Sequence, residues 1–492
     1  MEEFRNPGID WAALSPVLVL LGGAAVVLLG ALFLPAGARR PLSGAAAVLT
    51  LLAAGAAAGI LLAVDDTGRA AVAGAIRRDR LAEVGQILVA GSALLAVGVS
   101  YGERDSTERV GDYYALLLSA AAGMAFFVQA NNLMTLFLGL EWFSISLYIL
   151  TAIAVDRLPS LEAGLKYLIV GSFGSAILLF GSALVYGATG ELQFAEIARA
   201  APAADRLTLV AGLAMILVGL GFKVSAAPFH MWTPDVYQGA PTPVTAFMSA
   251  ATKVAALIVT MRVLVEAFPS ERDLWTVALA VIVCVSLAWG NLAALVQADV
   301  KRMLAYSSVS HAGFLLMPLA AGNEFGGWSL LYYLVPYAPM SLGAFAIVAI
   351  RERELARPVT FANLAGFGWE RPFLGLAMAI LMFGFIGLPP TGLFFGKFFA
   401  FSAAYERGWI WLVIVGVVAT IVSIYYYLNV VRMMFFAPPE LRVAPVGGAP
   451  PRDLPLQLAV AASLVVAIGS LFAVNPLRDL MNNAVAFLDF PF

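Results

Sequence analysis

The sequence predicts an all-α polytopic membrane protein with about fourteen transmembrane helices, arranged as two inverted five-helix repeats in which helices 7 and 12 are broken. Three observations predict this class. Of the 492 residues, 61% are hydrophobic and only 12% are charged, against roughly 25% charged residues in soluble domains. Apolar runs of about 20 residues, long enough to cross a bilayer, recur along the whole chain. Two of these runs are interrupted by proline and glycine and carry a lysine, which is typical of the broken helices of transporters.

The composition also limits the function. The net charge of -2 and the absence of a basic run argue against nucleic acid as a partner. The single cysteine, Cys284, lies in an apolar run, so the chain can form no internal disulfide and cannot supply the four thiolates of an iron–sulfur cluster. The N-terminus lacks the basic flank of a secretory signal, so we expect the apolar run over residues 17–34 to be retained as the first span.

The expected spans follow one another closely. Their centres lie near Val26, Leu52, Ser92, Leu118, Ile145, Leu178, Leu213, Val254, Val283, Phe314, Ala344, Phe383, Val415 and Val465. An even number of spans places both termini on one side of the membrane. Arginines are more frequent in the connections that follow odd-numbered spans, apart from the cluster Arg77, Arg78 and Arg80. The positive-inside rule therefore predicts that both termini are non-cytoplasmic.

The seventh span contains the most unusual charge. Lys223 lies within an apolar run and Pro228 follows it. Because Pro228 has no N–H to donate to the carbonyl of Val224, the helix should break just after Lys223. A lysine at the centre of a membrane helix costs roughly 2.5–3.5 kcal/mol, and a broken helix is tolerated at this depth only inside protein or beside water. We expect a charge and its water path here.

The twelfth span repeats this design. Pro389 and Pro390 free the carbonyls of Phe385 and Ile386, and Lys397 follows. Five spans separate the two breaks, and an odd offset is what an inverted repeat requires, because each unit enters from the opposite face. We expect N-terminal helices over residues 1–110, a first repeat over 111–270, a second repeat over 271–437, and a linker with a C-terminal helix over 438–492.

The lysines are few and unusually placed. The chain has only Lys166, Lys223, Lys253, Lys301 and Lys397, and all but Lys301 lie in apolar runs. Arginine supplies the other basic positions. A desolvated lysine can lose its proton whereas arginine effectively cannot, so buried lysines are candidates for proton transfer.

Each buried charge also has a simpler interpretation. Glu141 is the only acid well inside a span, and we expect it to pair with Lys223, either as part of a relay or as a static ion pair. Lys166 has Glu162 one turn earlier, so a snorkelling ion pair and a proton role both stay open. Lys253 and Lys397 have no acid within a turn, which favours a functional role.

Two histidines complete the set of candidates. His311 follows Ser307 and Ser308 by four and three residues, so it is either a neutral histidine bonded to a serine or a member of a proton relay. His230 lies beside Trp232, where interfacial packing is the simpler interpretation. We expect Asp299, Lys301 and Arg302 to be anchors at the cytoplasmic boundary, and Pro336 and Pro339 to kink the eleventh span.

Several segments resemble one known family. They are Leu138-Gly-Leu-Glu141, Glu162-Ala-Gly-Leu-Lys166, Tyr186-Gly-Ala-Thr-Gly-Glu-Leu192, Gly221-Phe-Lys223 with the stretch from Pro228 to Pro243, the stretch from Lys301 to His311, and Gly387-Leu-Pro-Pro-Thr-Gly-Leu-Phe-Phe-Gly-Lys397. From about the fourth span to the thirteenth, the chain resembles the antiporter-like subunits of bacterial respiratory complex I, the proton-translocating NADH–quinone oxidoreductase. The lysine at the twelfth span and the absence of a long lateral helix resemble the subunit N group among them.

The resemblance implies a proton relay. Glu141 and Lys223 would be the pair at the broken seventh helix, and Lys166 would modulate that pair. In the second part of the relay, Lys253 would pass the proton on, the central path would include His311, and Lys397 would be the terminal site. Pro228, Pro389 and Pro390 would break the two helices.

The resemblance also implies partners. The antiporter-like subunit M and the small subunit K would be neighbours in a bacterial inner membrane. FMN, iron–sulfur clusters and quinone would lie in partner subunits, with no cofactor in this chain. A subunit of a multi-subunit cation/proton antiporter is the main alternative, since it would share the fold and the buried charges. A purely structural spacer of the membrane arm is the third.

Overall fold

The computed structural model describes residues 8–64, 68–103, 109–438, 440, 453–488 and 490. Its helices are α1 (Trp11–Phe33), α2 (Ala36–Val64), α3 (Arg80–Ser100), α4 (Val110–Phe127), α5 (Leu133–Thr151), α6 (Leu158–Thr189), α7 (Phe194–Ala200), α8 (Arg206–Val224), α9 (Thr233–Gly239), α10 (Thr242–Phe247), α11 (Lys253–Ala267), α12 (Arg272–Leu295), α13 (Val300–Ala321), α14 (Glu324–Leu355), α15 (Phe367–Glu370), α16 (Pro372–Ile386), α17 (Leu393–Glu406), α18 (Ile410–Phe436), α19 (Leu454–Phe472) and α20 (Val474–Val485). The two strands are β1 (Arg69–Ala71) and β2 (Ile76–Arg78).

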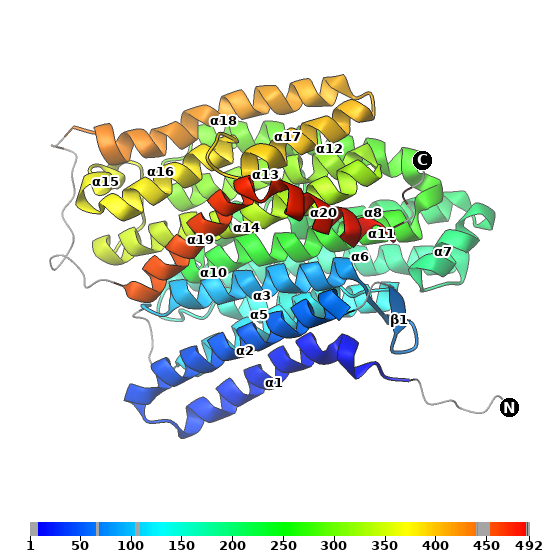
Figure 1. Cartoon of the computed structure of the whole chain (residues 1–492), viewed down its shortest axis with the longest axis horizontal. Coiled ribbons are helices and arrows are strands. Elements are labelled where there is room, and N and C mark those ends of the chain that lie inside the picture. Colours follow the sequence, from blue (N-terminus) through cyan, green and yellow to red (C-terminus); the bar gives the residue numbers. More distant parts are fainter. Residues whose placement is uncertain are drawn as a thin grey trace.

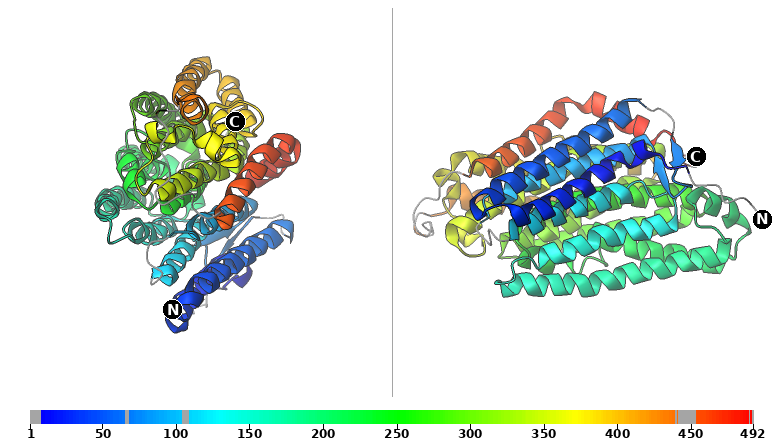
Figure 2. Two further views of the ribbon diagram at one scale, coloured as in Figure 1. Left: turned by 90° about the vertical axis from the view of Figure 1, so that its left-hand side faces the viewer. Right: turned by 90° about the horizontal axis from the view of Figure 1, so that it is seen from below.

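The predicted fold class is confirmed. Within the described ranges, 13 helices are long and apolar enough to cross a membrane, or up to 14 if a bent pair is one span. Every expected span centre lies in a helix. The long helices run side by side, and α1 begins at the end of the bundle where α20 ends, at the right of Figure 1 (see also Figure 2). The inverted relation of the two repeats and their boundaries stay predictions.

Both predicted helix breaks are present. The seventh span stops at Val224, and the twelfth is divided into α16 and α17. Two features were not predicted: the small antiparallel hairpin of β1 and β2, and a π-helical turn over Met248–Thr252 that interrupts the eighth span between α10 and α11. Single π turns of this kind often mark functional sites.

The core lies around the eighth, tenth and eleventh spans. These three, formed by α10 with α11, α13 and α14, are almost wholly enclosed by other helices, whereas α1, α2, α18 and α19 lie at the periphery (Figure 2). The contact between α12 and α13 is extensive, and it is close because Gly290 has no side chain: a Cβ there would lie 2.5 Å from the backbone nitrogen of Ser310. Among the buried polar groups of these central helices are Lys253, Arg262 and His311.

A buried ion-pair cluster joins the hairpin to the core. The Arg262 guanidinium is fully buried and donates to both carboxylate oxygens of Asp79 at 2.7 Å, and also to Glu266 at 3.1 Å. Arg77 lies 3.4 Å from Asp79 and 3.3 Å from Glu266. These arginines are neutralised inside the protein, which explains why a basic cluster can lie at the end of the bundle opposite to most of the other arginines. The ring of Phe487 packs against Arg77 and ties the C-terminal segment to the cluster.

Candidate functional site

The break after Lys223 is built from local backbone contacts. Ser225 adopts a left-handed conformation with φ of 64° and ends α8. The backbone N–H of Ala226 donates to the carbonyl of Gly221 at 2.9 Å, and the indole N–H of Trp232 donates to the carbonyl of Phe222 at 3.1 Å. Carbonyls that the missing helical turn would leave unpaired thus find donors. The last turn of α8 places Lys223 at the break, where the residue is buried and only 2% exposed.

Aromatic rings surround the Lys223 amine. Its Nζ lies 5.4–5.5 Å from the ring centroids of Phe143, Tyr148, Tyr167 and Phe222, and it has no hydrogen-bond partner among the described residues. Ring faces attract a cation by roughly 2 kcal/mol or more when the pair is desolvated. The amine is therefore held where it can carry a charge without a fixed acceptor.

Glu141 is a neighbour of this amine but not a contact. The carboxylate, on α5, interacts electrostatically with Lys223, Tyr148 and Tyr167, yet within the described part of the chain it forms no salt bridge, and one of its oxygens is buried without a hydrogen-bond partner. The predicted interaction between Glu141 and Lys223 is thus a through-space electrostatic interaction and not a salt bridge. A carboxylate with an unsatisfied oxygen is free to change its distance from the amine at little cost in hydrogen bonds.

Lys166 forms a surface ion-pair group. Its Nζ lies 2.8 Å from Glu162 and 3.1 Å from Asp235, and Arg302 donates to the other oxygen of Asp235 at 2.6 Å. Asp235 lies in α9, outside the spanning helices. Burial alone would raise the pKa of Asp235, but the hydrogen bonds from Arg302 and Lys166 outweigh it and lower the pKa below its ordinary value. The ion pair expected for Lys166 is therefore present, and its modulating role stays a prediction.

Lys253 is the first residue after the π-helical turn. Its Nζ is fully buried and donates to the backbone carbonyl of Ser308 on α13, and it lies 5.9 Å from the Tyr337 ring centroid. The hydroxyl of Ser308 lies 3.3 Å from the hydroxyl of Tyr337. Lys253 therefore lies beside a pair of hydroxyl groups, those of Ser308 and Tyr337, and sequence spacing did not reveal this contact.

His311 lies at the centre of the site and is bonded to tyrosines. Its Nδ1 is 3.0 Å from the hydroxyl of Tyr333, and its Nε2 is 3.1 Å from the hydroxyl of Tyr427. Ser307, one helical turn before His311, reaches the imidazole only through a hydrogen bond with Tyr427. The predicted bond to a serine is thus replaced by two phenols, because α14 and α18 place larger hydroxyl donors closer to the ring.

A small cavity of about 10 Å³, close to the space that one water molecule needs, adjoins this centre. Its polar lining comes from Ser307, Ser308, Ser341 and Tyr337. The His311 ring lies beside Tyr337, whose ring is also next to the Lys253 amine. It also lies beside Phe314, whose ring is next to the Lys397 amine.

Lys397 lies in α17, the second half of the broken twelfth span, and is the last buried lysine of the site. Its Nζ donates at 3.0 Å to the carbonyl of Ile386, one of the two carbonyls that the following prolines were predicted to free, and lies 4.2 Å from the ring centroid of Phe314. Gly387, at the end of α16, has φ of 95°, and a Cβ there would lie 2.7 Å from Cδ of Lys397. Only glycine leaves room for the lysine at this break.

Replacing Gly387 with alanine should therefore displace the Lys397 side chain. Positive φ costs roughly 1–2 kcal/mol for a residue with a Cβ, and the steric contact adds to it. Gly408 is a matched control, because it has φ of 81° but no other atom lies within 4 Å of the place that a Cβ would take. We expect Gly387→Ala to lower both the melting temperature and proton translocation, and Gly408→Ala to lower only the melting temperature. Equal translocation in the two variants would contradict this role.

The structure corrects the interpretation of Lys301. It was expected to be a boundary anchor, but its residue is only 2% exposed. The Nζ donates to the carbonyl of Ala240 at 2.9 Å and lies 3.6 Å from Glu352, which accepts a further hydrogen bond from Thr242. The start of α10 and the end of α14 fold over the lysine, and this burial comes from segments distant in the sequence. Arg302 and Asp299 do lie at the helix end, where Asp299 caps α13.

The other expectations concern residues near these charges. His230 packs with its ring centroid 5.9 Å from Trp289 and 6.5 Å from Tyr306, in agreement with aromatic packing. Pro336 and Pro339 lie inside α14, which is one helix over its whole length. No group of three or more potential metal ligands occurs in the ranges that the structure describes.

Comparisons with known proteins complete the description of the site. Residues 130–423 match the model of the family described as NADH:quinone oxidoreductase/Mrp antiporter, transmembrane. NADH-quinone oxidoreductase subunit N 2 of Roseiflexus castenholzii is 37% identical, over 99% of this chain and 98% of that protein. A chain of respiratory complex I from Thermus thermophilus, with bound aureothin, is 33% identical over 95% of this chain and 100% of its own length, with a TM-score of 0.80. A chain of the Mrp complex from a Dietzia species has a TM-score of 0.85 over 97% of both chains, but at 20% identity this likeness shows the fold alone.

Proposed function

The chain belongs to the NADH:quinone oxidoreductase/Mrp antiporter family, within its group of NADH-quinone oxidoreductase N subunits, and on this basis we propose that it translocates protons in the membrane arm of a bacterial NADH–quinone oxidoreductase. The observation that carries the proposal is the series of buried basic groups formed by Lys223, Lys253, His311 and Lys397. Each of these residues is at most 4% exposed. None of them has a carboxylate within salt-bridge distance among the described residues, as a static ion pair would require.

The first step of the proposed mechanism is a change of charge at Lys223. Glu141 favours the ammonium through space. If a neighbouring subunit draws the carboxylate away, the desolvated amine releases its proton, because burial disfavours the charged form. The four rings attract the charged amine and enclose the neutral one. Such a switch needs a mobile acid next to a fixed base.

The second step passes the proton to the other half of the chain. Lys253 reaches Ser308, and the Ser308 and Tyr337 hydroxyls lie within hydrogen-bond distance. Both imidazole nitrogens of His311 meet a phenol, so the ring can accept a proton on one nitrogen and release it from the other. Lys397 is then the terminal site, and water molecules would bridge the gaps between side chains.

Assembly and coupling belong to the proposal as well. Quinone reduction and the FMN and iron–sulfur clusters would lie in partner subunits, subunits M and K would be the neighbours, and the chain itself would hold no cofactor. Both termini would lie on the non-cytoplasmic side. The two broken helices would occupy equivalent places in two inverted repeats, which accounts for the similar position of Lys223 and Lys397 beside a break.

Replacing Glu141 with glutamine tests the proposal at its switch. We expect NADH-driven proton translocation in inverted membrane vesicles to fall by roughly tenfold or more, the factor that one pKa unit of lost interaction represents. Glu191→Gln is the control, because Glu191 is exposed in the connection after α6. If Glu141→Gln vesicles translocated protons as fast as Glu191→Gln vesicles, the switch would be ruled out.

The main alternative is a multi-subunit cation/proton antiporter, which has the same fold. Sodium-dependent proton exchange by vesicles that lack any NADH or quinone partner would favour it. A structural spacer would instead keep full coupling after every buried lysine is neutralised.

A further inference from the structure

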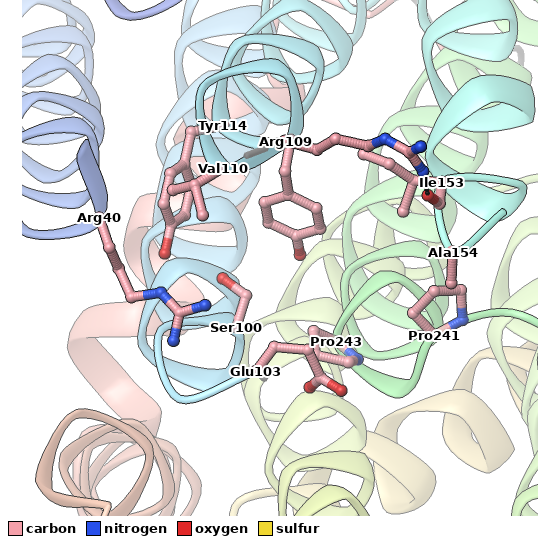
Figure 3. A pocket seen from close by; sticks show the side chains of 11 residues that line it. Arg40, Ser100, Glu103, Arg109, Val110, Tyr114, Ile153, Ala154, Pro241 and Pro243 are labelled. Carbon is pink, nitrogen blue, oxygen red and sulfur yellow. Dashed lines mark hydrogen bonds between the residues drawn. The ribbon is translucent and has the colours of Figure 1, made fainter. Parts of the chain in front are cut away.

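A second cavity is lined by none of the residues Lys223, Lys253, His311 and Lys397. About 560 Å³ of empty space, part of it open to solvent, lies where α2 and α4 begin and α3 and α5 end (Figure 3). This end of the bundle is opposite to the start of α1 (Figure 1). Arg40 and Tyr114 enter the cavity from one side, and Arg109 extends along the other toward Ile153 (Figure 3). Ser100 and Glu103 also line it.

The two arginines of this cavity lack acidic partners among the described residues. Arg109 makes one hydrogen bond there, to the carbonyl of Ile153 at 3.3 Å, and Arg40 makes no hydrogen bond or ion pair with any residue that the structure describes. Glu103 does not neutralise them, because it forms an ion pair with Arg353 at 2.7 Å. Arg353 also forms an ion pair with Asp453. Among the described residues, the charged lining of the cavity is thus two arginines and one carboxylate that is already paired.

An apolar groove begins at the same arginine. Arg109 and Ile153 line both the cavity and an open groove of about 1180 Å³ between α4, α5 and α6. Its walls include Leu116, Ile149 and Leu165, and Leu165 is 58% exposed. Asp112 is the one acid among the described residues along it and lies in the first turn of α4, where it complements the helix dipole.

We propose that this cavity and groove together bind an anionic glycerophospholipid. An acyl chain fits the groove of leucine and isoleucine side chains, and the phosphate fits the guanidinium of Arg109, with Arg40 within the same cavity. Arg109 is also the residue directly before α4, at the edge where the cavity meets the groove. The positive-inside rule explains arginines at this end of the bundle, but not a hollow that joins them to an apolar groove.

The first experiment tests headgroup recognition by measuring lipid binding to the full-length chain. The chain is purified in detergent and titrated with phosphatidylglycerol or phosphatidylcholine, and bound lipid is counted by native mass spectrometry. We expect tighter binding of phosphatidylglycerol, and a loss of about fivefold in Arg109→Gln, the effect of one basic residue on an anionic lipid. Arg157→Gln is the control, because Arg157 is exposed near the start of α6 and lines neither cavity. Equal affinities in the two variants would overturn the proposal.

The second experiment identifies what occupies the groove in the assembled membrane complex. Leu165→Trp should fill the groove and reduce co-purified lipid, whereas Leu179→Trp, on an exposed part of α6 outside the groove, should not. A photoreactive benzoylphenylalanine in place of Leu165 should form adducts with phospholipid. Adducts with a polypeptide would show that a neighbouring subunit covers the groove, and would refute a lipid there. The proposal is independent of the proton relay, so neither experiment depends on proton translocation.

Discussion

Replacing Lys223 with methionine will abolish proton translocation and leave the membrane complex assembled. Methionine fills a similar volume inside the cage of Phe143, Tyr148, Tyr167 and Phe222, so packing is preserved while the only proton acceptor of the cage is lost. The amine makes no hydrogen bond to a described residue, so its removal breaks no hydrogen bond there, and Glu141 loses only a through-space interaction. Proton uptake by vesicles, with complex assembly followed on native gels, measures both outcomes.

The charge-conserving variant separates a proton carrier from a structural cation. Lys223→Arg keeps the positive charge, but a guanidinium holds its proton under all physiological conditions, so we expect this variant to be inactive too. Arg206→Gln, at the exposed start of the same helix, is the control. Wild-type translocation by Lys223→Arg would show that position 223 needs only a charge.

The helix breaks could be predicted from the sequence because their cause is local. Pro228 and Pro390 each remove a backbone donor within an apolar run, and this alone limits how the segment can fold. The hydrogen bond from Lys397 to Ile386 follows from the same cause, since a freed carbonyl beside a buried amine needs a donor.

The surroundings of each charge could not be predicted because they come from distant segments. The rings around Lys223 belong to α5, α6 and α8, and the phenols that bind His311 belong to α14 and α18. Tyrosines inside apolar spans were the available signal, because a buried hydroxyl needs a partner. Lys301 shows the same limit: its charge pattern resembled a boundary anchor, and only the fold of α10 and α14 over it revealed its burial.

Removal of the Arg262 guanidinium should cause the largest loss of stability of any single change. Asp79 and Glu266 would keep their buried carboxylates with only the partly exposed Arg77 as a cation beside them, and breaking a buried ion pair in this way costs about 3–5 kcal/mol. Arg262→Met should lower the melting temperature of the purified chain, and the half-buried thiol of Cys284 can report unfolding through a thiol-reactive dye. Arg199→Gln breaks an exposed pair with Glu196 and should cost about 0–1 kcal/mol.

A triple variant distinguishes lost charge compensation from lost packing. If the uncompensated carboxylates cause the effect, Asp79→Asn and Glu266→Gln added to Arg262→Met should recover much of the stability, because neutral partners carry a far smaller desolvation cost. If the arginine matters mainly for its volume and for the ring of Phe487 beside it, the triple variant should melt no higher than the single one. Recovery would mean that the cluster joins the hairpin to the core by electrostatic compensation, and that the arginines at this end of the bundle remain there because they are neutralised.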